Sequence, residues 1–545
     1  MLMNRHEVTA QIFNTISQAL DAAATTNAEL VFYTSKAVCQ HRLSYSDLRL
    51  HAVATAHKLT GLGLPRGSRI GMIADTSPDF LIAFYACQYA GFCACPLPAS
   101  VLVGGKQDYI DKLISMMRHA QASLILSPRS LMPCAEAVSA ELCIPDMSYN
   151  DLFSLTTVAP IAPFTANENA YIQYSSGSTR YPKGVVISQK AICTNATAII
   201  RFGLCLSEDD RAFSWLPFYH DMGLVGFSLA PLFGACSVDY MSPAAFARNP
   251  ALWLDLMQKN GSTITYAPSF AYDLVTRRYP VERSLDLSKL RVAGIGGDMI
   301  NIDILERFAT HFKPYGFNWA AFTPSYGMAE AVLAITIADH ANPLRVVQFE
   351  NSGRTLVSCG KPLPGIEITI IDEQSQAVAE GVEGRILVRG ANIMYSYFAD
   401  DLATNAVIRE DGFLDTGDLG TLIEGELIVT GRHKDMILQR GRNIWPQDIE
   451  AVAEAAITTR IGAVAAIGVD DGEYEALIVL VENGAMDTEQ RNDLAMAICA
   501  AISRAHGVVS QIVYVAPRWL PYTSSGKLAR QQAKHKYLNE IRTGD

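Results

Sequence analysis

The stretch RIGMIADTSPDFLIAFYACQYAGFCACPLP, residues 69–98, contains two short apolar runs with a longer apolar segment between them. The short runs RIGMIA and CACPLP are typical of buried strands, and the segment DFLIAFYACQYAG has the length of a helix. A strand, a helix and a second strand in this order predict parallel strands joined by a covering helix. The segment before them, DLRLHAVATAHKL at residues 47–59, has the pattern of an amphipathic helix.

The same alternation of strands and helices continues along the chain. Strand-like runs recur as ASLILS, STITYAP and LRVAGIGG, at residues 122–127, 262–268 and 290–297. We therefore predict an α/β fold with a large N-terminal domain of mainly parallel sheets packed with helices.

After residue 360 the chain becomes rich in strands separated by turns. IEITIIDE, GRILVRG and ELIVTGR, at residues 366–373, 384–390 and 426–432, predict a β-rich subdomain. The remaining segment mixes strand-like and helix-like runs and is long enough for a small α+β domain. We predict that residues 1–433 form the N-terminal domain and residues 434–545 a mobile C-terminal domain.

Composition narrows the classes of function. Of the 545 residues, 49% are hydrophobic and 18% charged, as expected for a globular protein with more than one core. The formal net charge is −11 and no block of Lys and Arg stands out, so a nucleic-acid partner is not expected. The eleven cysteines are scattered without a CxxC pair, and MLMNRHEVTAQIF lacks the apolar centre of a signal peptide. We predict a cytoplasmic protein without stable membrane insertion.

The segment YSSGSTRYPKG, residues 174–184, lies between the strand-like runs AYIQY and VVIS. Its glycines let backbone N–H groups approach an anion, its hydroxyls can donate to phosphate oxygens, and Lys183 adds positive charge. It is not a Walker A loop, because a strand rather than a helix follows the lysine. The segment indicates a phosphate-binding loop, and the alternative is a Ser/Gly-rich turn without a ligand.

Five further motifs follow this loop. They are SWLPFYHDMGLVG, PSYGMAEA, LDTGDLG, GRHKDMI and TSSGKL, at residues 214–226, 324–331, 414–420, 431–437 and 523–528. The ordered set resembles the adenylate-forming superfamily of acyl-CoA ligases, peptide-synthetase adenylation domains and luciferases, over nearly the whole chain. The resemblance implies an enzyme that activates a carboxylic acid with ATP.

Within that superfamily the chain is most similar to the fatty acyl-AMP ligases, which activate a fatty acid and pass it to an acyl carrier protein. Arg180 stands where typical acyl-CoA ligases have glycine, and Ala329 rather than threonine precedes Glu330. One feature departs from the pattern. Those ligases carry an insertion after the YGxAE segment that hinders use of coenzyme A, and residues 331–359 are short for it.

The resemblance also implies roles for individual residues. Attack of a carboxylate on the α-phosphorus of ATP brings two anions together, so the site must neutralise charge. The residues expected to hold the β- and γ-phosphates are Ser175, Ser176, Gly177, Ser178, Thr179 and Lys183. Glu330, with Thr179, is the expected ligand set for Mg²⁺, which prefers hard oxygen ligands. The expected catalytic residues are Lys527, His220, Lys183 and Glu330.

The remaining nucleotide contacts fall on three motifs. Tyr326 offers a face for adenine, and Asp418 can accept both ribose hydroxyls. The full set of expected ATP or AMP contacts outside the phosphate loop is Gly296, Gly297, Asp298, Ser325, Tyr326, Gly327, Met328, Asp418 and Arg432. For GIGG the alternative is a plain turn at a strand end, and for Asp418 a turn-forming aspartate.

Two further assignments concern movement and the acid. Lys434 matches the hinge about which the small domain of this superfamily rotates. His220 either guards the entry of the carboxylate or is a half-buried histidine with a structural partner. The acyl pocket is expected beyond it, lined by Trp215, Phe218, Met222 and Phe270, although such clusters are often plain core.

We therefore predict an enzyme that uses ATP and Mg²⁺ to convert a fatty or related carboxylic acid into acyl-AMP and pyrophosphate. The acyl group then passes to the phosphopantetheine thiol of a separate acyl carrier protein, as in lipid, polyketide or lipopeptide biosynthesis. The first alternative is an acyl-CoA ligase with the same adenylation step. The second is a non-catalytic nucleotide-binding or carrier-docking protein, which would be expected to lack Lys527, Glu330 or Asp418.

Overall fold

The computed structural model describes residues 4–99, 105–175, 183–280, 283–340, 342, 344–349, 354–439, 442–457, 463–470, 475–483, 486–522 and 527–542. These residues form two compact units. The large unit comprises the described residues up to Ser175, Lys183–Thr416 and Gly420–Val429, and the C-terminal unit comprises Gly417–Leu419 and the described residues from Thr430 onward. The predicted domain boundary after residue 433 stays a prediction.

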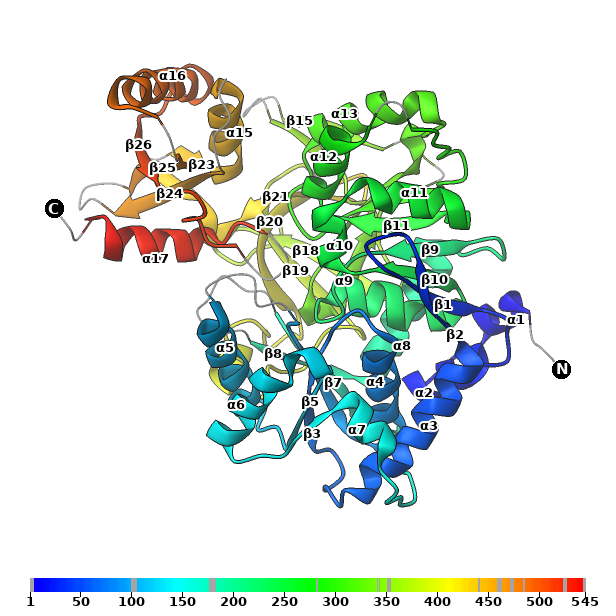
Figure 1. The fold of residues 1–545 in the computed structure, drawn as a ribbon. Coiled ribbons are helices and arrows are strands. Elements are labelled where there is room, and N and C mark those ends of the chain that lie inside the picture. Colours follow the sequence, from blue (N-terminus) through cyan, green and yellow to red (C-terminus); the bar gives the residue numbers. More distant parts are fainter. Residues whose placement is uncertain are drawn as a thin grey trace. The chain divides into compact units, whose positions relative to one another are not determined.

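The large unit is built on two sheets of mainly parallel strands (Figure 1). Among the described residues one sheet has nine strands, in the spatial order β17 (Lys361–Pro362), β14 (Ala334–Ile337), β13 (Phe322–Gly327), β12 (Val292–Ile295), β11 (Ile264–Ala267), β9 (Arg211–Ser214), β10 (Ser237–Met241), β1 (Glu29–Tyr33) and β2 (Cys39–Ser44). The other has six, in the order β6 (Asp146–Ser148), β5 (Leu124–Ser127), β3 (Arg69–Ile73), β4 (Cys93–Leu97), β7 (Asn169–Tyr174) and β8 (Gly184–Ser188). The first sheet is parallel from β13 to β1, and the second from β6 to β7.

Residues 69–98 form the strand, helix and strand that their pattern predicts. Strands β3 and β4 pair in parallel, and α4 (Pro78–Ala90) connects them. Ser77 accepts a hydrogen bond from the Phe80 N–H, and Gly91 ends the helix in the left-handed conformation with φ +74°. Every residue from Phe80 to Ala90 is buried. The helix is apolar on all sides because it lies in the core that the two sheets share.

The other helices of the large unit pack on the sheets. Figure 1 shows α11, α12 and α13 together on one side of the nine-stranded sheet, and α5 and α6 beside the six-stranded one. The helix bounds are α1 (Arg5–Ala10), α2 (Ile16–Ala23), α3 (Tyr45–Gly61), α5 (Gly105–His119), α6 (Met132–Leu142), α7 (Tyr149–Ser154), α8 (Gln189–Ala198), α9 (Asp221–Leu224), α10 (Pro243–Arg248), α11 (Ala251–Asn260), α12 (Ser269–Arg278), α13 (Ile302–Phe312) and α14 (Asp401–Asn405).

The β-rich region after residue 360 is present as predicted. Its sheet has the order β18 (Ile366–Ile371), β19 (Gly384–Gly390), β20 (Leu414–Ile423) and β21 (Glu426–Arg432). A separate antiparallel pair, β15 (Val346–Phe349) and β16 (Arg354–Val357), precedes it in the chain.

The C-terminal unit mixes sheet and helix, also as predicted. Its elements are β22 (Ile437–Gln439), β23 (Arg442–Ile444), α15 (Pro446–Ala456), β24 (Val464–Asp470), β25 (Glu475–Glu482), α16 (Thr488–His506), β26 (Ser510–Val515) and α17 (Arg530–Glu540). Strands β24, β25 and β26 form one sheet, and its two faces contribute to two apolar cores. The predicted α/β class, with large parallel-rich sheets, covering helices and a β-rich subdomain, is confirmed.

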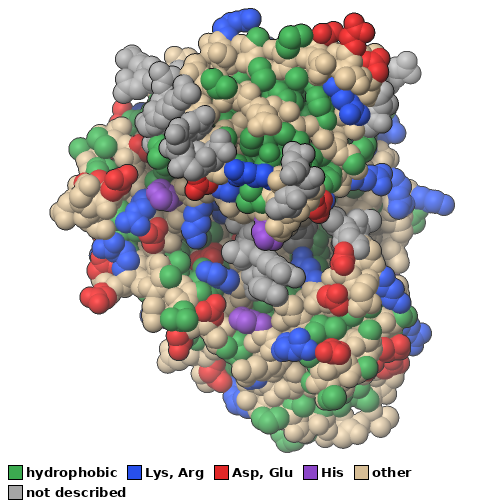
Figure 2. All heavy atoms as spheres, turned by 90° about the vertical axis from the view of Figure 1, so that its left-hand side faces the viewer, with side chains coloured by type: hydrophobic (Ala, Val, Ile, Leu, Met, Phe, Trp, Pro, Cys, Tyr) green, Lys and Arg blue, Asp and Glu red, His purple; other side chains and the backbone are tan. Residues whose placement is uncertain are grey.

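Three further features concern the cysteines, the length of the apolar helices and the surface charges. All eleven cysteines are free thiols. Within the described ranges no helix is both long and apolar enough to cross a bilayer. Figure 2 shows Lys and Arg side chains interspersed with Asp and Glu on the face that it presents.

Candidate functional site

Four of the predicted site segments lie along one edge of the nine-stranded sheet. Trp215 follows β9, Gly296–Asp298 follow β12, and Ser325–Gly327 end β13. Phe270 lies at the start of α12, just after β11. Because β9, β11, β12 and β13 are parallel, these segments share the carboxyl edge of the sheet, where α/β proteins bind their ligands.

The glycines of GIGG allow this edge to be tightly packed. A Cβ atom on Gly296 would lie 2.7 Å from the Ser325 Oγ atom, so a larger residue would push the ends of β12 and β13 apart. Gly297 has φ +82°, which favours glycine. Asp298 is exposed and accepts a hydrogen bond from the Met299 N–H at 2.9 Å. Tyr326 is 9% exposed.

The two ends of the predicted phosphate loop meet at the hairpin of β7 and β8. The Ser175 N–H donates to the Lys183 carbonyl at 3.0 Å, which closes the base of the loop. The Gln173 Nε2 atom donates to the Tyr219 carbonyl at 2.8 Å and ties this base to the HDMG segment. Ser176, Gly177, Ser178, Thr179 and Arg180 lie outside the described residues, so their phosphate and metal contacts stay predictions.

Lys183 and Glu330 meet around a residue that the motifs did not indicate, Tyr397. The Tyr397 hydroxyl donates to the Glu330 Oε1 atom at 2.8 Å, and the Lys183 Nζ atom lies 4.5 Å from the centroid of the Tyr397 ring. Tyr397 is 4% exposed and Glu330 8%. Burial, and then the Glu330 charge, raise the pKa of Tyr397, so the phenol keeps its proton and remains a donor.

The turn that carries Glu330 is strained. Glu330 lies in a short 3₁₀ turn, Ala329–Ala331, and the next residue, Val332, has φ +68° and ψ −61°. The Leu333 N–H donates to the Ala331 carbonyl at 2.9 Å, which closes a γ-turn around Val332. A buried β-branched residue in this conformation costs about 1–3 kcal/mol, and such strain is concentrated at functional sites.

The described part of the chain contains no group of three or more His, Cys, Asp and Glu side chains that could hold a metal by themselves. Glu330 offers a single, well-oriented carboxylate. Mg²⁺ commonly binds through one or two carboxylates together with substrate phosphates and water, so this donor fits the ion.

His220 is partly buried and has a close partner. Its Nδ1 atom lies 2.7 Å from the Asp221 Oδ1 atom, which also accepts the Met222 N–H at 2.7 Å. The Met222 N–H also lies 3.3 Å from the His220 Nδ1 atom, so the side chains of His220 and Asp221 both cap the start of α9. Both interpretations of His220, the guard and the structural histidine, remain compatible with this geometry.

The aromatic residues assigned to the acyl pocket divide into two groups. Trp215 stacks on Phe246 with centroids 3.8 Å apart, and Phe270 meets Trp215 edge-on at 6.1 Å. Phe270 is 40% exposed and Met222 is half-buried. Phe218 instead is fully buried and stacks on Phe80 at 5.6 Å. The pocket assignment stays a prediction for all four residues.

In the C-terminal unit, Asp418 lies in β20 and Arg432 ends β21, whereas Lys434 and Lys527 lie outside the strands. The Arg432 Nε atom donates to the Asp418 Oδ1 atom at 3.1 Å, so the two residues assigned to the nucleotide face each other. Lys434 is exposed in the turn His433–Asp435, and its carbonyl accepts from the Gln531 Nε2 atom at 2.9 Å. Tyr522 and Leu528 form an isolated antiparallel bridge, and Lys527 lies beside it.

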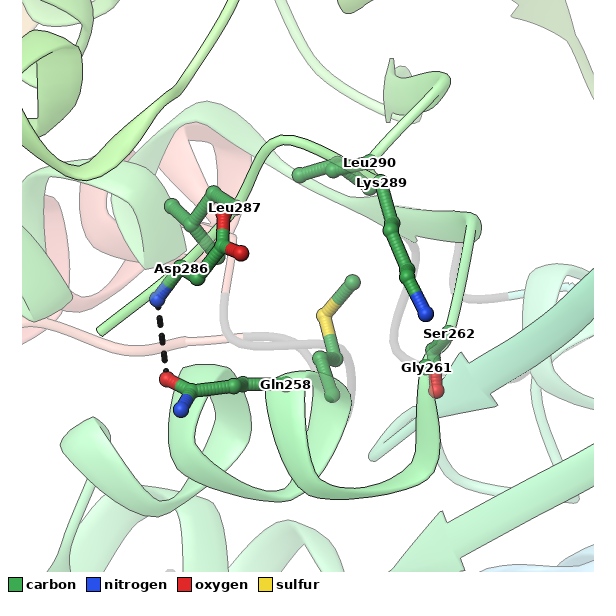
Figure 3. Close-up of a pocket in the computed structure, with 8 residues that line it drawn as sticks. Gln258, Gly261, Ser262, Asp286, Leu287, Lys289 and Leu290 are labelled. Atoms are coloured by element: carbon green, nitrogen blue, oxygen red, sulfur yellow. Dashed lines mark hydrogen bonds between the residues drawn. The ribbon is translucent and has the colours of Figure 1, made fainter.

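A pocket of about 150 Å³ lies elsewhere in the large unit (Figure 3). Figure 3 shows the Gln258 side chain accepting from the Asp286 N–H, at 2.9 Å, with Lys289 across the opening. Ser262 and Leu290, which also line it, precede β11 and β12. The pocket therefore lies at the amino edge of the sheet, opposite the candidate site.

Comparison with known proteins agrees with this geometry. The family model described as AMP-binding enzyme matches residues 20–398. The chain is 38% identical to a putative acyl-CoA synthetase of Caulobacter vibrioides, covering 96% of each chain. It is 33% identical to the 4-hydroxyphenylalkanoate adenylyltransferase of Mycobacterium tuberculosis, over 87% of this chain and 83% of the relative.

A solved structure from structural and functional studies of fatty acyl-adenylate ligases from E. coli and L. pneumophila superposes with a TM-score of 0.92. It is 38% identical, and the match covers 98% of this chain and 99% of that one. The resemblance inferred from the motifs is thus confirmed. The chain is an adenylating enzyme and belongs to the AMP-binding enzymes of the adenylate-forming superfamily.

Proposed function

We propose that the protein joins a fatty or related carboxylic acid to AMP and then transfers the acyl group to a carrier-protein thiol. The observation that carries this proposal is the meeting of Lys183 and Glu330 around Tyr397, at the base of the phosphate loop. A cation and a fixed carboxylate at this point suit the phosphates of ATP and their Mg²⁺. The solved structure of the fatty acyl-adenylate ligases supports a fatty acid as substrate, and the name 4-hydroxyphenylalkanoate adenylyltransferase supports a related carboxylic acid.

The proposed first step is an in-line displacement. A carboxylate oxygen of the acid attacks the α-phosphorus, the bond from that phosphorus to the bridging oxygen breaks, and pyrophosphate leaves. Lys183 and the loop hold the leaving phosphates, Asp418 and Arg432 hold the ribose, and Lys527 stabilises the developing charge. Mg²⁺ held by Glu330 would supply further charge neutralisation when bound.

In the proposed second step a thiol attacks the acyl carbon and AMP leaves. Lys434 is the proposed hinge for the change between the two steps. We propose the phosphopantetheine thiol of a separate carrier protein as the acceptor, and a cytoplasmic location for both proteins.

The short region after Glu330 bears on the choice of acceptor. It contains the hairpin β15–β16, and Arg345 beside it pairs with Glu424 at 2.9 Å in the turn between β20 and β21. The Ser358 Oγ atom donates to the Glu426 Oε2 atom at 2.8 Å. These contacts anchor the strand pair to the turn and strand that follow β20, but the region is short for the insertion that hinders use of coenzyme A, so selection against coenzyme A rests on the other motif matches. The alternative, an acyl-CoA ligase, is favoured by the name of the Caulobacter relative.

Product analysis tests the proposal. The enzyme is incubated with ATP, Mg²⁺ and acids of graded length, first alone and then with a holo carrier protein or coenzyme A, and products are identified by mass. We expect acyl-AMP and pyrophosphate without an acceptor, and faster transfer to the carrier than to coenzyme A. Comparable or faster turnover with coenzyme A would replace the carrier proposal by the acyl-CoA ligase. Absence of acyl-AMP with every acid would contradict the function itself.

A further inference from the structure

Tyr397 lies between two residues of the proposed phosphate and metal site. Its hydroxyl holds Glu330 and its ring lies under Lys183, although the three residues come from separate parts of the chain. We propose that Tyr397 is a positioning residue for adenylation, which sets the Glu330 carboxylate for Mg²⁺ and the Lys183 ammonium for phosphate. This inference rests on the proposed function, because it assumes those roles for Glu330 and Lys183.

The segment that carries Tyr397 is fastened to the strand of Lys183. The Phe398 N–H donates to the Gly184 carbonyl at 2.7 Å, and the Val186 N–H donates to the Ser396 carbonyl at 3.2 Å. Val185 and Tyr397 form an antiparallel bridge between these two bonds. The segment thus continues the sheet beyond β8, and Lys183 enters that strand directly above the ring.

The same segment is fastened to the Glu330 turn. The Met394 N–H donates to the Glu330 carbonyl at 2.8 Å, and the Asn392 Nδ2 atom donates to the Ala331 carbonyl at 3.0 Å. These bonds hold the backbone at the glutamate and at the residue after it, next to the strained γ-turn at Val332. The Tyr397 hydroxyl then fixes the side chain.

Tyr397 itself has little freedom to move. Its N–H donates to the Thr404 Oγ1 atom at 2.9 Å, and Thr404 lies in the short helix α14, whose first turn Asp400 caps. Because the ring is buried and the backbone of Tyr397 is hydrogen-bonded, the hydroxyl is already oriented, and little side-chain entropy is lost when a ligand binds. The groups that orient a metal ligand typically change metal affinity or activity 10- to 100-fold when they are removed.

The test variant is Tyr397→Phe, which removes the hydroxyl and keeps the ring under Lys183. We expect the Mg²⁺ concentration for half-maximal adenylation to rise about tenfold, with a smaller loss of kcat at saturating Mg²⁺. Tyr397→Leu also removes the ring, and we expect its KM for ATP to rise by a further ~2- to 5-fold. If Tyr397→Leu does not fold, Tyr397→Phe still decides the proposal.

A binding measurement gives a readout that does not depend on turnover. Calorimetric titration with ATP, in Mg²⁺ and in EDTA, measures how much the ion strengthens ATP binding. That gain should shrink in Tyr397→Phe and stay unchanged in Tyr395→Phe. The control is matched, because Tyr395 lies two residues away, is 56% exposed and donates its hydroxyl to Asn169 instead.

The variant Glu330→Gln separates the positioning role of Tyr397 from the metal-binding role of Glu330. If it abolishes the Mg²⁺-dependent gain while Tyr397→Phe leaves both the gain and the Mg²⁺ requirement at wild-type values, the positioning role of Tyr397 is wrong and the proposed function stands. If Glu330→Gln retains the gain, the metal role of Glu330 is wrong, and the inference about Tyr397 fails with it.

Discussion

The site residues of the large unit and those of the C-terminal unit differ in how firmly the fold holds them. The first group is Lys183 and Glu330, and the second is Asp418, Arg432, Lys434 and Lys527. In the large unit, Glu330 is 8% exposed and a buried tyrosine, two backbone bonds and a strained turn fix its position. In the C-terminal unit, Asp418 is also buried, at 7% exposed, but the Arg432 side chain is 56% exposed and Lys434 lies on an exposed turn. The buried residues of the large unit are positioned before a ligand binds, whereas the exposed side chains of the C-terminal unit are suited to the proposed rotation of that domain. We infer that the first group binds the phosphates of ATP and their Mg²⁺, whereas in the second group Asp418 and Arg432 hold the ribose and Lys527 completes the chemistry.

The largest effect should come from Lys527→Ala. Removal of one positioned cation at the reacting phosphate should slow adenylation by about 10²- to 10³-fold. The fold should be unaffected, since surface substitutions usually change stability by less than about 0.5 kcal/mol. Pyrophosphate release measures the rate, and Lys536→Ala, on α17 of the same unit, is the control. Normal release by Lys527→Ala would remove this lysine from the reaction.

Asp418→Ala should have the next largest effect. The carboxylate is expected to accept both ribose hydroxyls, and hydrogen bonds to charged groups are each worth about 1.5–3 kcal/mol. We expect a non-hydrolysable acyl-adenylate mimic to bind about 10- to 100-fold more weakly, as measured by calorimetry. Equal affinities would identify Asp418 as a turn former that holds Arg432.

Lys434→Pro should separate the two half-reactions. Proline fixes φ near about −65° and restricts rotation at this turn, while it keeps the carbonyl that accepts from Gln531. Adenylation should continue, and thiol transfer should fall about tenfold, which corresponds to ~1.4 kcal/mol on the barrier. Single-turnover assays of each step measure both rates. Unimpaired transfer would place the hinge at another residue.

A separate prediction concerns stability rather than catalysis. Asp75 follows β3 in the large unit, and burial raises its pKa to about 6, with a smaller contribution from Asp79. The folded state therefore keeps this proton to a higher pH than the unfolded state does, and the protein loses stability as the pH rises from about 4 to 6. Asp75→Asn should remove that loss, worth at most about 3 kcal/mol above pH 6.

Thermal unfolding across pH 4–8 checks this prediction. The gain in Tm of Asp75→Asn over the wild type should grow between pH 4 and 6 and then level off. A gain that is the same at every pH would show that Asp75 does not titrate in this range.

Sequence patterns predicted the parts of the molecule that depend on local chemistry. The alternation in residues 69–98 predicted β3, α4 and β4, because strand and helix periods are visible in a single segment. The motifs assigned roles to residues but not positions on a sheet; the structure brings Trp215, Gly296–Asp298 and Ser325–Gly327 to the carboxyl edge of the nine-stranded sheet, and their roles stay predictions. Tyr397 was missed because its role comes from contact with Glu330, 67 positions away, and no spacing in the sequence encodes such a contact. The strain at Val332 was missed because nothing in its residue type favours a positive φ.

The most direct test of the division between the two groups is calorimetric titration of Lys527→Ala with ATP, in Mg²⁺ and in EDTA. The account predicts that this variant binds ATP with wild-type affinity and with the full Mg²⁺-dependent gain, although it forms almost no acyl-AMP. Loss of ATP binding in step with loss of adenylation would contradict it, because Lys527 would then be needed to bind the nucleotide.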